Sequence, residues 1–436
     1  MRKIGVVALG AALAFVLISG AAQAASTPQF TLVAPDTAGF DAAKLKALDD
    51  AMDQAVDTGE VAGIEIMAVR HGKIVDLHMH GNKHLGSDAI ARDTIFRLYS
   101  QTKPMIGVAM MILYEMGLWK LDDPITKFIP QFAALKVLGA DGKLEDMVHP
   151  PTMRELMTHT AGFGYGLRTG NPVDDAFRAQ KVLQSNGLQE MVDKIATIPL
   201  LFQPGTKWSY SAAVDIQGYI IEKLSGQTLG AFMADHVWKP LRMTDTGFMV
   251  PPENAARLSG VFVNNEMTGN KLYEIPAGTI PGVQDFTKPP PLESGGGGSV
   301  STVDDYARFC QMILNKGELD GVRILKPESV AMLQQNQLES TVVPEAMGGL
   351  PAIGSDALGF GLDFAVVLDP DKLQVPEGKG SIWWGGAAGT WFWIDPKNDL
   401  YFLGMIQRFG GGAAGSARLS LSSQKLFYPA LTNPEK

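Results

Sequence analysis

The sequence predicts a mixed α/β fold (α+β), in which strands from both ends of the chain form one antiparallel sheet flanked by helices. Alternating apolar patterns typical of strands occur at residues 64–80 and again at 359–407, whereas residues 121–292 contain helical patterns separated by loops rich in Pro and Gly. Strands from the two ends bury their apolar faces best in one shared sheet. We therefore expect one lobe formed by residues 25–120 and 293–436, and a mostly helical inserted lobe formed by residues 121–292.

The first 24 residues are expected to be an export signal peptide. Arg2 and Lys3 form a basic start, residues 4–18 are apolar or small, and residues 22–24 have the small-x-small pattern of a cleavage site. The alternative is an uncleaved anchor, but the apolar stretch is shorter than the roughly 20 residues that a bilayer span requires. We expect cleavage after Ala24, a periplasmic or secreted mature chain and no stable membrane anchor, with the oligomeric state left open.

Periodicity predicts the individual elements. In chain order, we expect an amphipathic helix at 41–57, hairpin strands at 64–70 and 73–80, an apolar helix at 102–116, helices at 212–224 and 303–315, strands at 359–367, 380–385, 390–394 and 400–407, and a last helix at 415–428. The four glycines at 295–298 favour a close backbone approach over regular structure.

Composition excludes other classes of protein. The chain has 436 residues, of which 46% are hydrophobic, and this excludes disordered and collagen-like chains. Its 37 Lys and Arg against 46 Asp and Glu give a net charge of −9, so we expect no nucleic-acid partner. The single cysteine, Cys310, cannot form an internal disulfide, and its helical apolar surroundings indicate a buried small residue.

A Ser-x-x-Lys pattern, Ser100 to Lys103, precedes the apolar helix. On a helix these side chains lie one turn apart on one face, so the amine can take the hydroxyl proton. The N–H groups and dipole at a helix N-terminus also stabilise a developing oxyanion. The pattern alone is weak evidence because it recurs at Ser422 to Lys425, and because an N-cap role for Ser100 or Thr102 explains it equally well.

Two other segments carry groups suited to a site. Tyr210 lies in a loop directly before an expected helix, although by itself it would be interpreted as a half-buried aromatic residue. Residues 383–390 form a strand whose small residues would let a substrate lie against the backbone. The alternative for this second segment is a hairpin turn with aromatic flanks.

Five motifs occur in the order found in penicillin-recognising serine hydrolases. They are Ser100-x-x-Lys103, the segment 156–162, Pro204-Gly205-Thr206 leading to Tyr210-Ser211, the segment 296–302, and Trp384-Gly385-Gly386. The chain thus resembles, from about residue 40 to about residue 428, the branch that contains class C β-lactamases, D-alanyl-D-alanine carboxypeptidases and family VIII carboxylesterases. The resemblance implies a β-lactamase/transpeptidase-like fold.

The resemblance also implies a role for each matched residue. Ser100 would be the acylated nucleophile, with Lys103 and Tyr210 as its proton-transfer partners. The backbone N–H groups of Ser100 and Ala387 would form the oxyanion hole. The substrate would lie along the last motif, Trp384, Gly385 and Gly386. The residues leave open whether Lys103 or Tyr210 takes the first proton, and no metal or organic cofactor is implied.

Two departures from the β-lactamases of this branch favour uncharged esters. Those enzymes carry Tyr-x-Asn, where this chain has Tyr210-Ser211-Ala212, and Lys-Thr-Gly, where it has Trp384 followed by two glycines. A site without the amide and the cation is poorly suited to an anionic β-lactam or a peptide C-terminus. We expect a serine esterase acting on a small-molecule ester. The alternatives are a β-lactamase, a D-alanyl-D-alanine carboxypeptidase or acyltransferase on the same fold, or a catalytically silent peptidoglycan-binding member.

A metal hydrolase is the rival mechanism, because His78, His80 and His84 have a superficial ligand spacing. They alternate with apolar residues, however, as in a half-buried strand with a solvated face, so we expect no metal site. An α/β-hydrolase is disfavoured because no serine lies in a Gly-x-Ser-x-Gly pattern. His159 belongs to the second motif, but we interpret it as a structural hydrogen-bonding residue.

Overall fold

The computed structural model describes all residues except 1–29, 266–267, 280–281, 347–351, 410–411 and 436. The expected signal peptide and its cleavage after Ala24 lie outside the described residues. Among the helices of the described residues, none has the length and apolar character needed to cross a bilayer.

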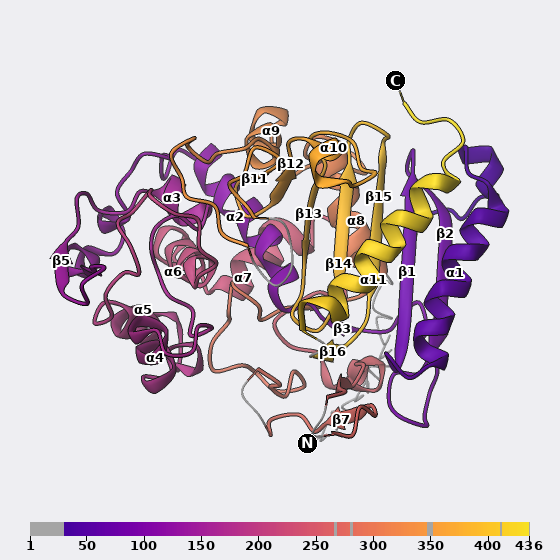
Figure 1. The fold of residues 1–436 in the computed structure, drawn as a ribbon, viewed down its shortest axis with the longest axis horizontal. Coiled ribbons are helices and arrows are strands. Elements are labelled where there is room, and N and C mark those ends of the chain that lie inside the picture. The colour runs from indigo at the N-terminus through magenta and orange to yellow at the C-terminus, as the bar shows by residue number, and fades with distance from the viewer. Residues whose placement is uncertain (1–29, 266–267, 280–281, 347–351, 410–411, 436) are drawn as a thin grey trace, which may run out of the picture.

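A seven-stranded antiparallel sheet forms the centre of the molecule, in the order β11-β12-β13-β14-β15-β1-β2 (Figure 1). Its strands are β1 (Gly63–Arg70), β2 (Lys73–Gly81), β11 (Leu358–Phe360), β12 (Ala365–Val367), β13 (Ile382–Gly385), β14 (Trp391–Asp395) and β15 (Leu400–Met405). β1, from the N-terminal part of the chain, pairs along its length with β15, from the C-terminal part. The prediction of one antiparallel sheet built from both ends of the chain is therefore confirmed.

Helices cover both faces of the sheet. α1 (Ala42–Asp57) and α11 (Gly412–Phe427) lie together on one face, and α8 (Val303–Leu314) packs on β1, β14 and β15 from the other (Figure 1). The alternation along β14 shows the two layers, because Trp391 and Trp393 join the core under α1 and α11, whereas Phe392 and Ile394 join the larger core on the opposite face. Cys310 of α8 is fully buried, as predicted.

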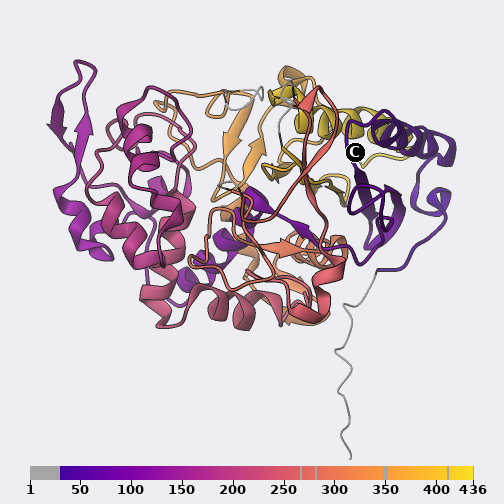
Figure 2. The ribbon, with the colours of Figure 1, turned by 90° about the horizontal axis from the view of Figure 1, so that it is seen from below.

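Most of the remaining helices and short strands come between β2 and β11 in the sequence. The helices are α2 (Lys103–Glu115), α3 (Met153–Met157), α4 (Pro172–Ala179), α5 (Leu188–Ile195), α6 (Ala213–Ser225), α7 (Leu229–Met233), α9 (Pro327–Gln334) and α10 (Pro370–Leu373). Short strands pair as β3 (Phe96–Arg97) with β8 (Val300–Ser301), β4 (Lys136–Leu138) with β5 (Leu144–Asp146), β6 (Val261–Val263) with β7 (Tyr273–Ile275) and β16 (Arg408–Phe409), and β9 (Glu318–Leu319) with β10 (Val322–Arg323). Helices α3 to α6 lie at the end of the molecule away from α1, where the β4–β5 hairpin projects (Figures 1 and 2).

One expectation about a strand was wrong in detail. Residues 359–367 form two strands, β11 and β12, because the chain turns back at Asp363, whose φ of +66° lies in the left-handed region. The histidine face of β2 is partly solvated, as expected, since the side chains of His78 and His80 are 24% and 38% exposed, and α1 lies along it with acidic side chains. The Nε2 atom of His78 lies 2.6 Å from Asp53, and that of His80 lies 2.9 Å from Asp57. Across the described part of the chain, no group of three or more His, Cys, Asp or Glu residues is arranged to hold a metal ion.

Candidate active site

Ser100 lies on a short 3₁₀ turn, residues 99–102, that leads from β3 into α2. The preceding residue, Tyr99, has a φ of +45°, a conformation that costs free energy for any residue with a Cβ atom. Its buried ring packs edge-on against Phe409, with the ring centroids 5.0 Å apart. Tertiary packing thus holds a strained turn that leaves Ser100 half-buried at the start of a deeply buried helix.

Lys103 is the first residue of α2 and is almost wholly buried, with 1% of its surface exposed. Its Nζ atom donates hydrogen bonds to Ser100 Oγ at 3.3 Å, Tyr165 OH at 3.2 Å and the Gly296 carbonyl oxygen at 2.5 Å. Nζ also lies over the rings of Tyr210 and Tyr165, 4.6 and 5.1 Å from their centroids. Three acceptors and two aromatic faces therefore stabilise an amine in the protein core.

Tyr210 completes a compact group around the serine. Its hydroxyl donates a hydrogen bond of 2.6 Å to Ser100 Oγ. Its ring packs between His159, Tyr165 and Trp384, at centroid distances of 5.1, 5.4 and 5.8 Å. The structure therefore brings three residues expected from the sequence to one point, with both the amine and the phenol in contact with the serine oxygen.

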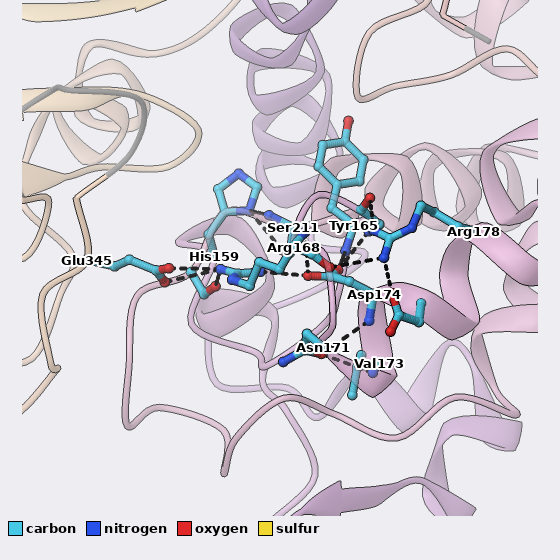
Figure 3. Close-up of polar contacts among 12 residues, drawn as sticks. His159, Tyr165, Arg168, Asn171, Val173, Asp174, Arg178, Ser211 and Glu345 are labelled. Carbon is cyan, nitrogen blue, oxygen red and sulfur yellow. Dashed lines mark hydrogen bonds and ion pairs between the residues drawn. The ribbon is translucent and has the colours of Figure 1, made fainter. Parts of the chain in front are cut away.

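His159 lies behind Tyr210 and is fully buried. Its Nδ1 atom lies 2.9 Å from Ser211 Oγ and accepts a hydrogen bond from the Ser211 backbone N–H at 3.3 Å. Burial, with the positive charge of Lys103, lowers the pKa of His159 well below its usual value, so the imidazole stays neutral. The interpretation of His159 as a structural hydrogen-bonding residue is confirmed (Figure 3).

Two residues of the site were not found from the sequence, Tyr165 and Asp215. Asp215, in the first turn of α6, accepts hydrogen bonds from Ser294 Oγ at 2.5 Å and the Gly296 N–H at 3.0 Å. Burial raises the pKa of Tyr165 well above its usual value, and the negative charges of Asp215 and of an ionised Tyr210 raise it further. The phenol of Tyr165 therefore stays protonated. The available signal was weak, since Tyr165 looks like a loop aromatic between glycines and Asp215 like an ordinary acid at a helix start.

The glycine run packs directly against this group. A Cβ atom on Gly296 would lie 2.2 Å from Asp215 Oδ2 and 2.7 Å from Tyr165 OH, so a side chain does not fit there. A Cβ atom on the neighbouring Gly297 would lie 3.4 Å from its nearest neighbour, the Tyr99 backbone, which is an ordinary contact. The glycine run was predicted to permit a close backbone approach. The structure shows this approach at Gly296, whose carbonyl oxygen accepts a hydrogen bond from Lys103.

Gly296→Ala is expected to destabilise the protein by about 1–3 kcal/mol through overpacking. It should also lower the activity of the site at least about tenfold, because Asp215 and Tyr165 must move away from the new methyl group. Gly297→Ala is the matched control and should retain most of the activity and stability. Urea unfolding and activity assays on both variants measure the effect, and equal behaviour of the two would contradict it.

The residues expected to form the oxyanion hole lie on adjoining segments. The turn at 386–389 closes with hydrogen bonds from Gly386 N–H to Thr390 O and from Gly389 N–H to Gly386 O. A Cβ atom on Gly386 would lie 2.2 Å from the carbonyl oxygen of Leu98, so this glycine lets the end of β13 approach the serine turn. Within the described residues, neither Ser100 N–H nor Ala387 N–H donates a backbone hydrogen bond, so both amides are available to an oxyanion.

The Trp384-Gly385-Gly386 motif divides into two parts. Only 2% of the surface of Trp384 is exposed, and its ring packs on Tyr210 and Phe360. Its side chain supports Tyr210 and offers almost no surface to a ligand, which differs from the expected direct contact. Gly385 and Gly386 are partly exposed at the end of β13 and are the accessible part of the motif.

Comparison with known proteins places this geometry in context. A family model described as Beta-lactamase matches residues 48–424. The chain is 31% identical to Esterase EstB from Burkholderia gladioli, over 89% of this chain and 96% of that protein, and 28% identical to a lovastatin esterase from Penicillium rubens, over 83% and 92%. The solved structure of EstCE1, described as a hydrolase with promiscuous acyltransferase activity, superposes with a TM-score of 0.74 at 25% identity, covering 88% of this chain and 98% of that one.

Fold and site together define a hydrolase of the β-lactamase and penicillin-binding-protein type. The chain belongs to the beta-lactamase family, and its relatives include esterases.

Proposed function

We propose that the chain is a carboxylesterase that hydrolyses uncharged esters through an acyl-enzyme on Ser100. The observation that carries the proposal is the contact of Ser100 Oγ with two proton-carrying groups, Tyr210 OH at 2.6 Å and Lys103 Nζ at 3.3 Å. A serine hydroxyl becomes a nucleophile when a neighbouring group takes its proton. A phenol and an amine on the same oxygen therefore support nucleophilic catalysis at Ser100.

In the proposed reaction, Ser100 Oγ bonds to the ester carbonyl carbon as its proton passes to the Tyr210–Lys103 pair. The N–H groups of Ser100 and Ala387 stabilise the negative charge that develops on the carbonyl oxygen. The pair then gives the proton to the leaving alkoxide as the C–O bond breaks, which releases the alcohol. A water molecule attacks the acyl-enzyme and gives its proton to the pair, and the carboxylic acid leaves as Ser100 regains a proton.

The surroundings of the site support an uncharged substrate. Trp384 stands where the β-lactamases of the family would have a cation for a substrate carboxylate, and Ala212, which is buried, stands where they would have an amide. The nearby guanidinium of Arg168 is paired with Asp174 and Glu345. The names of Esterase EstB and of the lovastatin esterase agree with ester substrates.

Intact-mass analysis tests the proposal most directly. The purified chain is incubated separately with a fluorophosphonate, a series of p-nitrophenyl esters and several β-lactams, and adducts are located by peptide mapping. We expect the fluorophosphonate and an acyl group from short esters to be found on Ser100. A chain that carries no adduct from any reagent would be a catalytically silent member, and an adduct on another residue would overturn the assignment of the nucleophile.

Hydrolysis of a chromogenic cephalosporin is expected to have a kcat/KM at least about 10³-fold below that of p-nitrophenyl butyrate. The reason is that the site lacks both polar groups that would bind the β-lactam, and unmet polar contacts discriminate strongly between substrates. Steady-state kinetics on both substrates with one enzyme preparation make the comparison. Comparable values would move the chain to the β-lactamase alternative.

Acyl transfer is the second candidate function, favoured by the description of EstCE1 as a hydrolase with promiscuous acyltransferase activity. The same acyl-enzyme serves both reactions, because an alcohol can replace water as the attacking group. Product analysis with an added alcohol distinguishes them. A new ester that accumulates faster than the free acid would favour the transferase, and free acid alone supports the esterase.

A further inference from the structure

Arg168 lies at the centre of a polar network beside the site (Figure 3). Its guanidinium donates hydrogen bonds to Asp174 Oδ2 at 3.2 Å, to Ser209 Oγ, and to the two carboxylate oxygens of Glu345 at 3.0 and 3.2 Å. The Asp174 side chain is fully buried, and that of Glu345 is 24% exposed. These partners come from separate segments of the chain, so one side chain ties together parts that the sequence keeps far apart.

The segment that contains Asp174, residues 165–174, begins with Tyr165. The Asp174 carboxylate accepts hydrogen bonds from the backbone N–H groups of Tyr165, Gly166 and Arg168, at 2.8, 2.7 and 3.1 Å. Burial alone would raise the pKa of Asp174, but these N–H donors and Arg168 outweigh burial and hold that pKa below its usual value. Asp174 is thus an anion that shapes the loop bearing Tyr165, and Arg168 is its charged partner.

The second segment carries Tyr210. Ser209, which receives a hydrogen bond from Arg168, directly precedes Tyr210 in the chain. The segment that bears Glu345 is bonded to the same stretch, because the Trp208 N–H donates to Val343 O at 3.1 Å and the Val343 N–H donates to Thr206 O at 2.9 Å. Arg168 therefore bridges the backbone that carries one phenol to the backbone that carries the other.

We propose that Arg168 is a positioning residue that sets the separation of Tyr165 and Tyr210 around Lys103 and Ser100. The inference rests on the proposed function, and it assigns to Arg168 an effect on the chemical step rather than on substrate binding. Both phenols contact the amine, which lies 3.2 Å from the hydroxyl of Tyr165 and 4.6 Å from the ring centroid of Tyr210. A small displacement of either phenol misaligns proton transfer, to which catalysis is highly sensitive.

Arg168→Met, which keeps a long side chain but removes every donor, tests the proposal. We expect kcat for p-nitrophenyl butyrate to fall about 10- to 100-fold, KM to change less than about threefold, and the pH dependence of kcat/KM to shift. Arg168→Lys keeps the charge but has no planar fork, so we expect it to recover only part of the loss. The matched control is Arg323→Met on β10, which removes a guanidinium bonded to Glu318, Lys316 O and Leu325 O and should leave kinetics unchanged.

A double-mutant comparison separates positioning from general destabilisation. If Arg168 acts through Tyr165, the loss in kcat for Arg168→Met combined with Tyr165→Phe will be clearly smaller than the product of the two single losses. Independent, multiplicative losses would overturn the proposal. So would a rise in KM at constant kcat, or a fall in melting temperature with unchanged kcat and pH profile.

Labelling of Ser100 by a fluorophosphonate keeps the proposal distinct from the ester assignment, because that reagent reports activation of the nucleophile whatever the natural substrate is. If the unmodified chain is labelled at Ser100 but cleaves no ester, the proposed function fails and the labelling rates still test Arg168. We expect Arg168→Met to be labelled at least about tenfold more slowly than the unmodified chain and Arg323→Met at the same rate. Equal labelling of Arg168→Met and the unmodified chain would overturn the positioning role.

Discussion

Ser100→Ala is expected to lower kcat/KM for p-nitrophenyl butyrate by at least about 10⁴-fold, the largest effect of any single substitution in this chain. Loss of Oγ removes the proposed nucleophile, the oxygen atom that both Tyr210 OH and Lys103 Nζ contact, so no acyl-enzyme can form. The substitution is small and lies on a half-buried turn, so the fold should be retained. Ester kinetics together with circular dichroism measure both quantities.

Ser422→Ala is the control that the chain itself supplies. Ser422 begins the second Ser-x-x-Lys pattern, which lies within the C-terminal helix α11, and this helix packs against α1. We expect this variant to have unchanged activity. Retained turnover by a folded Ser100→Ala variant, or a comparable loss in Ser422→Ala, would exclude Ser100 as the nucleophile.

Tyr210→Phe is expected to produce the second largest effect, a fall in kcat/KM of about 10³-fold, because it deletes the hydroxyl bonded to Ser100 Oγ at 2.6 Å. Tyr165→Phe is the matched comparison, since both phenols pack against Lys103 but the hydroxyl of Tyr165 bonds the lysine rather than the serine. Loss of one hydrogen bond to a charged group predicts a smaller effect of about 10- to 100-fold.

The order of the two tyrosine effects is the informative result, and kcat/KM over a range of pH measures it. An equal loss in both variants would mean that the hydroxyl of Tyr210 has no special part in proton transfer. The imidazole of His159 should contribute no step near its usual pKa, because burial and the charge of Lys103 hold that pKa well below its usual value.

Periodicity predicted the elements of the fold that depend on local pattern. The amphipathic helix expected at 41–57 follows from which side of an element meets the core, and the structure confirms it as α1, with its apolar side buried. The single strand expected at 359–367 was wrong, because the reversal at Asp363 comes from a left-handed residue with no glycine to mark it. A pattern of apolar residues does not distinguish one strand from two that lie on the same sheet.

The sequence predicted those residues of the candidate site that belong to recognisable motifs. Ser100, Lys103 and Tyr210 stand in recognisable patterns, and the structure places them together. Asp215 and Tyr165 carry no such pattern, because each acquires its place from packing against Gly296, a residue that was expected only to permit close approach.

By itself, the sequence determined the family, the antiparallel sheet shared by the two ends of the chain, and the identity of the groups that meet at the serine. These features follow from residue type and spacing, which local chemistry and side-chain periodicity express directly. Only the tertiary structure decided which group touches which. It buried Trp384 against Tyr210, paired the histidines of β2 with the acids of α1, and joined Arg168 to Ser209 and Glu345, which lie far from it in the sequence. Such contacts depend on how separate elements pack, and packing is decided by the whole core rather than by any one segment.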